Sequence, residues 1–183
     1  MKIPSQAKKV FTGNIFDVYQ WEQEMYDGSH QTFEMLKRPA TVQVIPVAGH
    51  EIFISHEEQP NKPRYYSLFG GRQEPGEDPL VCARRELMEE TGFESNDWEL
   101  YKEYEFPGKI DWTVYLYIVR DCKKVAEQHL DAGEKIDIKP VSFKTFLDIV
   151  TGESYWGQET SNHFLRLMQS PEKLLEFKNR LFK

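Results

Sequence analysis

The segment from Asp78 to Gly92 constrains this chain more than any other, because it carries the start and stop signals of a helix. Asp78 is placed to cap the first turn, Pro79 suits the first helical position, and Gly92 suits the residue after the last turn. The apolar residues recur at helical spacing and predict the buried face: Leu80, Ala83 and Leu87. The sequence therefore predicts an amphipathic helix here.

Glutamates crowd the same helix, because Glu89 follows Glu86 at i+3 and Glu90 follows it at i+4. Like charges at this spacing destabilise a helix by roughly 0.2–0.5 kcal/mol per pair. A solvated acidic face is the ordinary interpretation of such a run. The preceding GGRQEPGEDP favours another, since a glycine-rich backbone can approach a ligand closely. Clustered carboxylate oxygens suit Mg²⁺ or Mn²⁺ held against substrate phosphates.

The length of 183 residues suits one domain with a small appendage. The proportions of hydrophobic residues, 39%, and charged residues, 29%, are typical of a soluble globular protein. No apolar run reaches the length of a membrane span, and the start MKIPSQAKKV lacks the apolar core of a secretory signal. We expect a cytoplasmic protein with no membrane partner.

The formal net charge of -7 argues against nucleic-acid binding, which needs a basic face to displace counterions from phosphates. An acidic chain that binds a phosphate-bearing substrate needs metal ions to mediate the contact. The two cysteines, Cys82 and Cys122, have no metal-like spacing and predict buried thiols rather than a disulfide scaffold.

The order of the remaining elements favours an α+β fold, with a mixed sheet and helices on its faces. Apolar patterns predict strands over residues 41–47, 51–56, 65–71, 97–106, 112–120 and 135–143. Helical punctuation predicts further helices over residues 142–150, 160–168 and from 171 to the end. The polar stretch 56–66 contains two prolines and predicts a loop.

Residues 14–26 and 31–38 predict an antiparallel β-hairpin around the turn Asp27-Gly28. Large aromatic residues fall on both of its faces: Phe16, Tyr19 and Trp21. A two-stranded ribbon is marginal alone. We therefore expect the main domain or a second copy of the chain to cover this hairpin.

Residues 71–93, GRQEPGEDPLVCARRELMEETGF, resemble the Nudix box. That pattern is a glycine, five residues, a glutamate, seven residues, then Arg-Glu, an aliphatic residue, any residue, Glu-Glu, any residue, Gly and an apolar residue. Every fixed position is met: Gly71, Glu77, Arg85, Glu86, Leu87, Glu89, Glu90, Gly92 and Phe93.

The resemblance implies the Nudix fold, an α/β/α sandwich with a mixed β-sheet, and hydrolysis of a nucleoside diphosphate linked to another moiety. It implies Mg²⁺ as the cofactor, with Mn²⁺ as a substitute. Glu86 and Glu90 would be its main ligands, Glu89 would assist, and the backbone carbonyl of Gly70 would complete the site.

The other matching positions imply supporting roles. Arg85 would take part in catalysis by orienting a glutamate through an ion pair, and a surface pair with Glu89 at i+4 is compatible with that role. Glu77 would brace the loop, and Gly71 and Gly92 would be structural glycines of the box.

Segments outside the box resemble the ADP-ribose and nucleotide-sugar pyrophosphatase branch: the N-terminal hairpin, RPATVQVIPV, EEQP and LDAGEKIDI. Members of that branch commonly dimerise through their N-terminal strands. The resemblance therefore implies a dimerisation region over residues 1–40, a Nudix hydrolase domain over residues 41–183, and a homodimer.

The same branch takes its general base from a glutamate on a loop, and Glu134 in DAGEK is the matching residue. Asp131 is a nearby rival, and a surface acid in a turn is the plain alternative for Glu134. Arg64 is a candidate for a phosphate contact or a solvated loop residue. The aromatic candidates for base stacking could equally belong to the core: Tyr65, Tyr66, Trp112 and Phe16.

The expected reaction is Mg²⁺-dependent cleavage of ADP-ribose or a related nucleoside diphosphate sugar into a nucleoside monophosphate and a sugar phosphate. The loop before the box departs from the branch, because Pro60 and Asn61 follow Gln59 where relatives often have an arginine. A dinucleoside polyphosphate or nucleoside triphosphate hydrolase is one alternative. A non-catalytic ADP-ribose sensor is another, but the box is complete.

Overall fold

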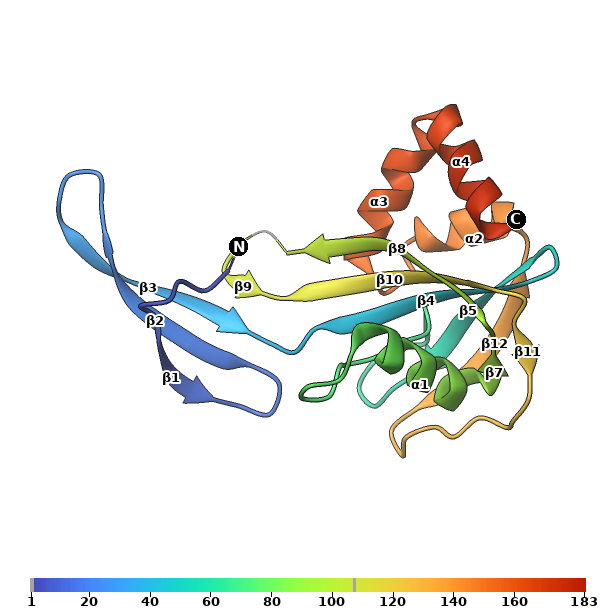
Figure 1. The fold of residues 1–183 in the computed structure, drawn as a ribbon, viewed down its shortest axis with the longest axis horizontal. Coiled ribbons are helices and arrows are strands. Elements are labelled where there is room, and N and C mark those ends of the chain that lie inside the picture. The colour runs from blue at the N-terminus through green and yellow to red at the C-terminus, as the bar shows by residue number, and fades with distance from the viewer. Residues whose placement is uncertain (1, 107) are drawn as a thin grey trace.

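The computed structural model describes residues 2–106 and 108–183 and contains a six-stranded mixed sheet at its centre (Figure 1). The strand order is β12-β5-β4-β10-β8, and β6 also pairs with β5. β4 and β10 are parallel, whereas β8 and β12 are antiparallel to their neighbours. The strands are β4 (Thr41–Ala48), β5 (Glu51–Glu58), β6 (Tyr65–Ser67), β8 (Asp97–Glu105), β10 (Thr113–Arg120) and β12 (Lys135–Val141).

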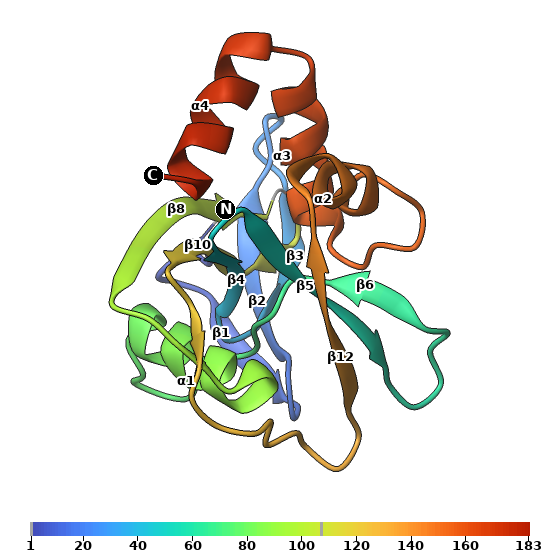
Figure 2. The ribbon, with the colours of Figure 1, turned by 90° about the vertical axis from the view of Figure 1, so that its right-hand side faces the viewer.

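Helices cover both faces of this sheet (Figure 2). They are α1 (Pro79–Thr91), α2 (Phe143–Val150), α3 (Gln158–Met168) and α4 (Pro171–Leu181). Alternation along β10 separates the two cores, because side chains two apart on a strand share a face. Leu116 and Ile118 pack with α2, α3 and α4, whereas Val119 packs with Leu87 of α1. The expected α/β/α sandwich is confirmed.

The punctuation of α1 is confirmed in detail. The Asp78 carboxylate accepts hydrogen bonds from the backbone N–H groups of Leu80, at 2.8 Å, and Val81, at 3.3 Å. Gly92 has φ 67°, and its N–H donates to the Met88 carbonyl at 2.7 Å. A residue with a side chain would be strained in this left-handed conformation, so Gly92 determines where the helix ends.

The remaining helices follow their predicted start signals with one shift. Ser142 caps α2 and Ser170 caps α4 through side-chain hydrogen bonds. α3 begins at Gln158, two residues before the predicted start at 160, and Gly157 caps it without a side chain. None of the helices in the described part of the chain is long and apolar enough to span a membrane.

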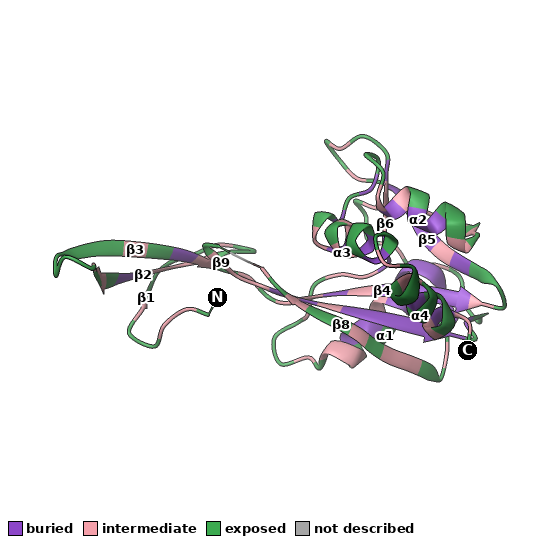
Figure 3. Ribbon diagram, turned by 90° about the horizontal axis from the view of Figure 1, so that it is seen from above, coloured by how far each residue is buried: buried purple, intermediate pink, exposed green. Residues whose placement is uncertain are grey.

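A four-stranded sheet in the order β1-β2-β3-β9 projects from the body (Figures 1 and 3). Its strands are β1 (Lys8–Thr12), β2 (Asp17–Glu24), β3 (His30–Lys37) and β9 (Ile110–Asp111). β2 and β3 form the predicted hairpin, and Gly28 in its turn has φ 82°. β1 and β9 were not predicted, because β1 is exposed at every residue and β9 has only two.

The predicted loop over residues 56–66 is wrong at its start, because β5 continues to Glu58. Backbone pairing with both β6 and β12 holds these polar residues in the sheet. The predicted strand over residues 65–71 ends early, at Ser67. Two short strands complete the chain: β7 (Phe93–Glu94) and β11 (Lys123–Lys124).

Candidate active site

Two consecutive glycines bring the backbone against the carboxylates of α1. Gly70 has φ 137°, and its N–H donates to Glu90 Oε2 at 2.7 Å. A Cβ on Gly70 would lie 2.1 Å from the Val42 carbonyl oxygen, and one on Gly71 would lie 2.5 Å from Glu86 Oε1. Gly70 cannot be replaced without moving the β4 backbone, whereas a side chain at Gly71 would displace the Glu86 carboxylate from its position.

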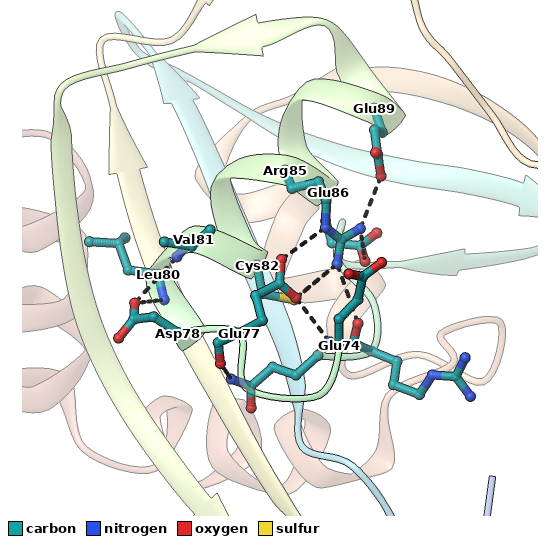
Figure 4. Close-up of polar contacts among 11 residues, drawn as sticks. Glu74, Glu77, Asp78, Leu80, Val81, Cys82, Arg85, Glu86 and Glu89 are labelled. Carbon is teal, nitrogen blue, oxygen red and sulfur yellow. Dashed lines mark hydrogen bonds and ion pairs between the residues drawn. The ribbon is translucent and has the colours of Figure 1, made fainter.

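Arg85 gathers the acidic side chains of the loop and the helix (Figure 4). Its Nε donates to Glu77 Oε1 at 3.0 Å and its Nη2 to Glu77 Oε2 at 3.1 Å, a bidentate pair. Its Nη1 donates to Glu86 Oε1 at 2.8 Å and to Glu89 Oε2 at 3.1 Å. The hydrogen bonds from Arg85 lower the pKa of Glu77 to about 2. The Glu74 N–H also donates to Glu77 at 3.0 Å, so this carboxylate ties the loop to the helix.

Glu90 lies deepest among the helix carboxylates, with 8% of its surface exposed. Burial raises the pKa of Glu90 well above its usual range, and the charges of Glu86, Glu57 and Glu134 raise it further. Burial also raises the pKa of Glu86, although Arg85 opposes this effect. Among the described residues Glu90 has no ion pair, so no side-chain cation compensates its charged form.

Glu57 on β5 is a further buried carboxylate of the site, with 7% exposed, and it is not among the site residues predicted from the sequence. Burial raises the pKa of Glu57, and the charge of Glu134 adds to the effect while Lys62 opposes it. The polar residues of HEEQP predicted a loop, so the sequence did not indicate that the Glu57 side chain points inward. Continued alternation from Phe53, which packs in the same core as α1, was the one available signal.

Glu134 approaches the helix carboxylates from a turn before β12. Its N–H donates to the Asp131 carbonyl at 2.9 Å, and its carboxylate lies 3.4 Å from the Asp131 N–H. Burial raises the pKa of Glu134, and repulsion from Asp131 and Glu89 adds to the shift. Tyr65 of β6 pairs with Glu57 of β5 and is also buried. Burial is the main cause that raises the pKa of Tyr65, and the negative charges of Glu57, Glu134 and Glu90 raise it further.

A cavity of about 480 Å³ adjoins Gly70 and Gly71, within the range of about 300–1,000 Å³ for small-molecule sites. Aromatic side chains line it: Phe106, Trp112, Tyr155 and Trp156. Trp156 is the most exposed of them, at 59%. Its ring lies 5.6 Å from that of Tyr65, which links the cavity to the carboxylates.

Trp112 lies in this cavity, but its own chain covers both faces of its ring. The Phe106 ring stacks on it at 4.1 Å, and the Arg38 guanidinium lies 4.3 Å from its centroid. Two groups this close cannot share one face, so they must lie on opposite faces. The Trp112 indole N–H donates to Thr41 Oγ1 at 3.1 Å. Trp112 therefore supports the cavity wall and offers only an edge to a ligand.

The structure does not bring Arg64 or Tyr66 to the carboxylates. Arg64 pairs with Asp137 of β12 at 2.7 Å. The neighbouring residue Ile136 packs in the core beneath α1, so Asp137 points to the opposite face of the sheet. The Tyr66 ring stacks on that of His56 at 4.4 Å. His56 is next to Glu57 on β5, so the two side chains point to opposite faces of the sheet. Phe16, 37% exposed, lies on the projecting N-terminal part, where Arg38 is 5.8 Å from its ring.

Comparison with known families decides the identity of this loop and helix. A model of the NUDIX domain matches residues 37–159, which include the glycine loop, α1 and Glu134. The chain belongs to the NUDIX domain family. Its Nudix box is the segment 71–93, and Arg85 ties both ends of that box together.

Known proteins are similar to this chain over most of its length. An ADP-ribose pyrophosphatase of Bacillus subtilis is 26% identical over 91% of this chain and 92% of its own length. A methanol dehydrogenase activator of Bacillus methanolicus is 26% identical over 85% and 86%. A crystal structure of an ADP compounds hydrolase superposes with a TM-score of 0.72 at 18% identity, covering 91% of this chain and 94% of that one. This last match shows the shared fold.

The carboxylates of the Nudix box have the chemistry of a divalent-cation site. Glu86 and Glu90 offer hard oxygen donors, and Glu57 and Glu134 add negative charge around them. Within residues 2–106 and 108–183, however, no three His, Cys, Asp or Glu side chains already converge as a metal site. Arg85 holds one oxygen of Glu86 and one of Glu89. The donors fit a cation, provided that these two side chains rotate toward it.

Proposed function

We propose that this Nudix hydrolase cleaves the pyrophosphate bond of ADP-ribose or a related nucleoside diphosphate sugar with the help of Mg²⁺, for which Mn²⁺ can substitute. The products are a nucleoside monophosphate and a sugar phosphate. The observation that carries the proposal is the buried, uncompensated carboxylate of Glu90 beside Glu86 and the Gly70 backbone. The name of the relative from Bacillus subtilis supports the substrate class.

We assign Glu86 and Glu90 as the metal ligands, with Glu89 assisting and the Gly70 carbonyl as a further donor. The cation, when bound, supplies positive charge that offsets the carboxylates and the diphosphate of the substrate. Arg85 positions Glu86 and Glu89 from the side, and its bidentate pair with Glu77 fixes its own guanidinium. Arg85 therefore acts through the glutamates rather than on the substrate.

We assign Glu134 as the general base. Water attacks one phosphorus, a new P–O bond forms, and the bond from that phosphorus to the bridging oxygen breaks. Glu134 accepts the proton from the attacking water, and the departing phosphate takes the electron pair of the broken bond. The raised pKa of Glu134 favours this role, because a base whose pKa lies nearer the working pH is a better proton acceptor.

We assign the projecting N-terminal sheet, with the proposed region 1–40, as a homodimer interface. Val10 is 52% exposed and Phe11 is 61% exposed on β1, and a second copy would cover them. Light scattering at micromolar concentration should give the mass of a dimer, and Phe11→Glu should shift it toward the monomer. A monomeric parent protein would remove this assignment.

A substrate panel tests the proposed reaction. ADP-ribose, GDP-mannose, UDP-glucose, diadenosine tetraphosphate and ATP are incubated with Mg²⁺ or Mn²⁺, and the products are separated by chromatography. We expect AMP and ribose 5-phosphate from ADP-ribose, with no turnover when EDTA is present. Inorganic pyrophosphate released from ATP as the fastest reaction would contradict the substrate class. Tight ADP-ribose binding without turnover would indicate a sensor.

A further inference from the structure

A second cavity, of about 440 Å³, lies between β8, α3 and the start of α4. Tyr104 and Leu167 line it and also pack in the core of α2, α3 and α4, so the cavity is on the face of the sheet opposite α1 (Figure 2). Its basic side chains come from three elements: Lys102 from β8, Arg166 from α3 and Lys173 from α4. The fold therefore gathers positive charge here from distant parts of the sequence.

These three basic side chains are not neutralised by the chain itself. Within the described residues, Lys102, Arg166 and Lys173 form neither an ion pair nor a side-chain hydrogen bond, and the Lys102 ammonium lies 5.5 Å from the centre of the Tyr104 ring. Glu99 on the same strand, by contrast, pairs with three basic side chains. The chain has 30 acidic residues against 23 basic ones, so a shortage of carboxylates does not explain the unpaired cations.

The arrangement of charges is unfavourable without an anion. Lys173 lies in the first turn of α4, where the helix carries partial positive charge, although Glu172 in the same turn offsets part of this repulsion. His163 also lines the cavity, and burial, followed by the charges of Lys102 and Arg166, lowers its pKa to about 4. The same positive charges that oppose protonation of this histidine attract an anion.

Glu159 is the one carboxylate among the described residues that line this cavity. It accepts a hydrogen bond from Gln43 Nε2 at 2.8 Å and also lines the cavity beside Gly70 and Gly71, so the two cavities are neighbours. One carboxylate against three cations leaves the second cavity with a net positive charge, in a protein whose formal net charge is -7.

Phosphate is the anion that such a set of donors suits, because guanidinium and ammonium groups form charge-assisted hydrogen bonds with its oxygens. The volume lies within the range of about 300–1,000 Å³ for small-molecule sites. We propose that this cavity is a second binding site, separate from the Nudix box, for a small soluble molecule that carries a phosphate group. Arg166 binds the phosphate oxygens, and Lys102 and Lys173 neutralise the remaining charge.

Calorimetry of the intact protein with ribose 5-phosphate in EDTA isolates this site, because without a cation the carboxylates of the Nudix box repel phosphate. We expect a dissociation constant below about 1 mM, and no binding of ribose, which lacks the phosphate. Arg166→Gln should weaken binding by at least about tenfold, as for the loss of a hydrogen bond to a charged group. Lys123→Gln is the matched control, because Lys123 is exposed on β11 and the change in net charge is the same, and it should bind like the parent protein.

Nuclear magnetic resonance locates the bound phosphate. The ring resonances of His163, which lines the cavity, should shift as ribose 5-phosphate is added at pH 7.5. Those of His30, which is exposed on β3 of the projecting sheet, should stay unchanged.

Three results would overturn the proposal: no binding of ribose 5-phosphate at about 10 mM, equal affinities of the Arg166→Gln and Lys123→Gln proteins, or binding that leaves the His163 resonances in place. Binding to vesicles of phosphatidylglycerol without binding of ribose 5-phosphate would also overturn it, since the partner would then be a lipid surface. These measurements use no metal and involve no hydrolysis, so their failure would leave the proposed reaction intact.

Discussion

The two halves of the acidic site are built in different ways. One half, from Gly71 to Gly92, comes from a single continuous segment whose charges are tied together by Arg85. The other half brings Glu57 from β5 and Glu134 from a turn 77 positions away, and neither forms an ion pair among the described residues. A continuous segment can carry its own counter-charge, whereas the distant half depends on the fold to bring it near a cation.

The largest effect should come from the point where the two halves meet, at Glu90. Glu90→Gln keeps the shape of the side chain but removes a proposed metal ligand, and we expect turnover of ADP-ribose to fall by about 1,000-fold or more. The fold should persist, because burial already disfavours the charged form of Glu90. Steady-state kinetics and thermal unfolding in EDTA check both statements.

Glu94→Gln is the matched control, because Glu94 is exposed just beyond the same helix. It should retain the parental rate. A Glu90→Gln protein as fast as this control would show that the metal assignment is wrong.

Glu57→Gln tests whether the distant half contributes to the reaction. We expect turnover to fall by about tenfold, less than for Glu90, because Glu57 adds negative charge around the proposed cation site. At pH 7 without metal, the free energy of unfolding should stay equal or rise, since the pKa of Glu57 is raised and its charged form is unfavourable in the folded state. Parental turnover together with lower stability would make Glu57 a purely structural residue.

Glu77→Gln tests the counter-charge of the continuous half. Hydrogen bonds between charged groups suggest a loss of about 1.5 kcal/mol in the free energy of unfolding at pH 7. The pKa of Glu77 is lowered from 4.5 to about 2, so its stabilisation is fully present above pH 4.5 and is lost as the pH falls toward 2. Urea denaturation from pH 7 to pH 3 should show the two proteins converging. A difference that grows as the pH falls would contradict this ion-pair account.

The smallest effect should come from Arg64. Its guanidinium pairs with Asp137 away from the carboxylates, so Arg64→Ala should change kcat/KM for ADP-ribose by less than about threefold, as expected for a surface ion pair. A loss above about 30-fold would restore the prediction from sequence that Arg64 binds a phosphate.

The continuous half was also the predictable half. Asp78, Pro79 and Gly92 act on backbone groups within one helical turn, so their effect can be predicted from the local sequence. Glu57 was missed because strand pairing with β6 and β12, which the sequence does not display, overrides the polar character of its neighbours. The covered faces of Trp112 escaped notice for the same reason, since Arg38 and Phe106 meet it only through the fold.

The most direct test of the account is Mn²⁺ binding followed by electron paramagnetic resonance, with a non-hydrolysable methylene analogue of ADP-ribose present. The metal-free parent protein and Glu94→Gln should bind Mn²⁺ with the same affinity. Glu90→Gln should bind it at least about tenfold more weakly, a difference of about 1.4 kcal/mol. Equal Mn²⁺ affinity in all three proteins would contradict the claim that the buried carboxylates of the box hold the cation.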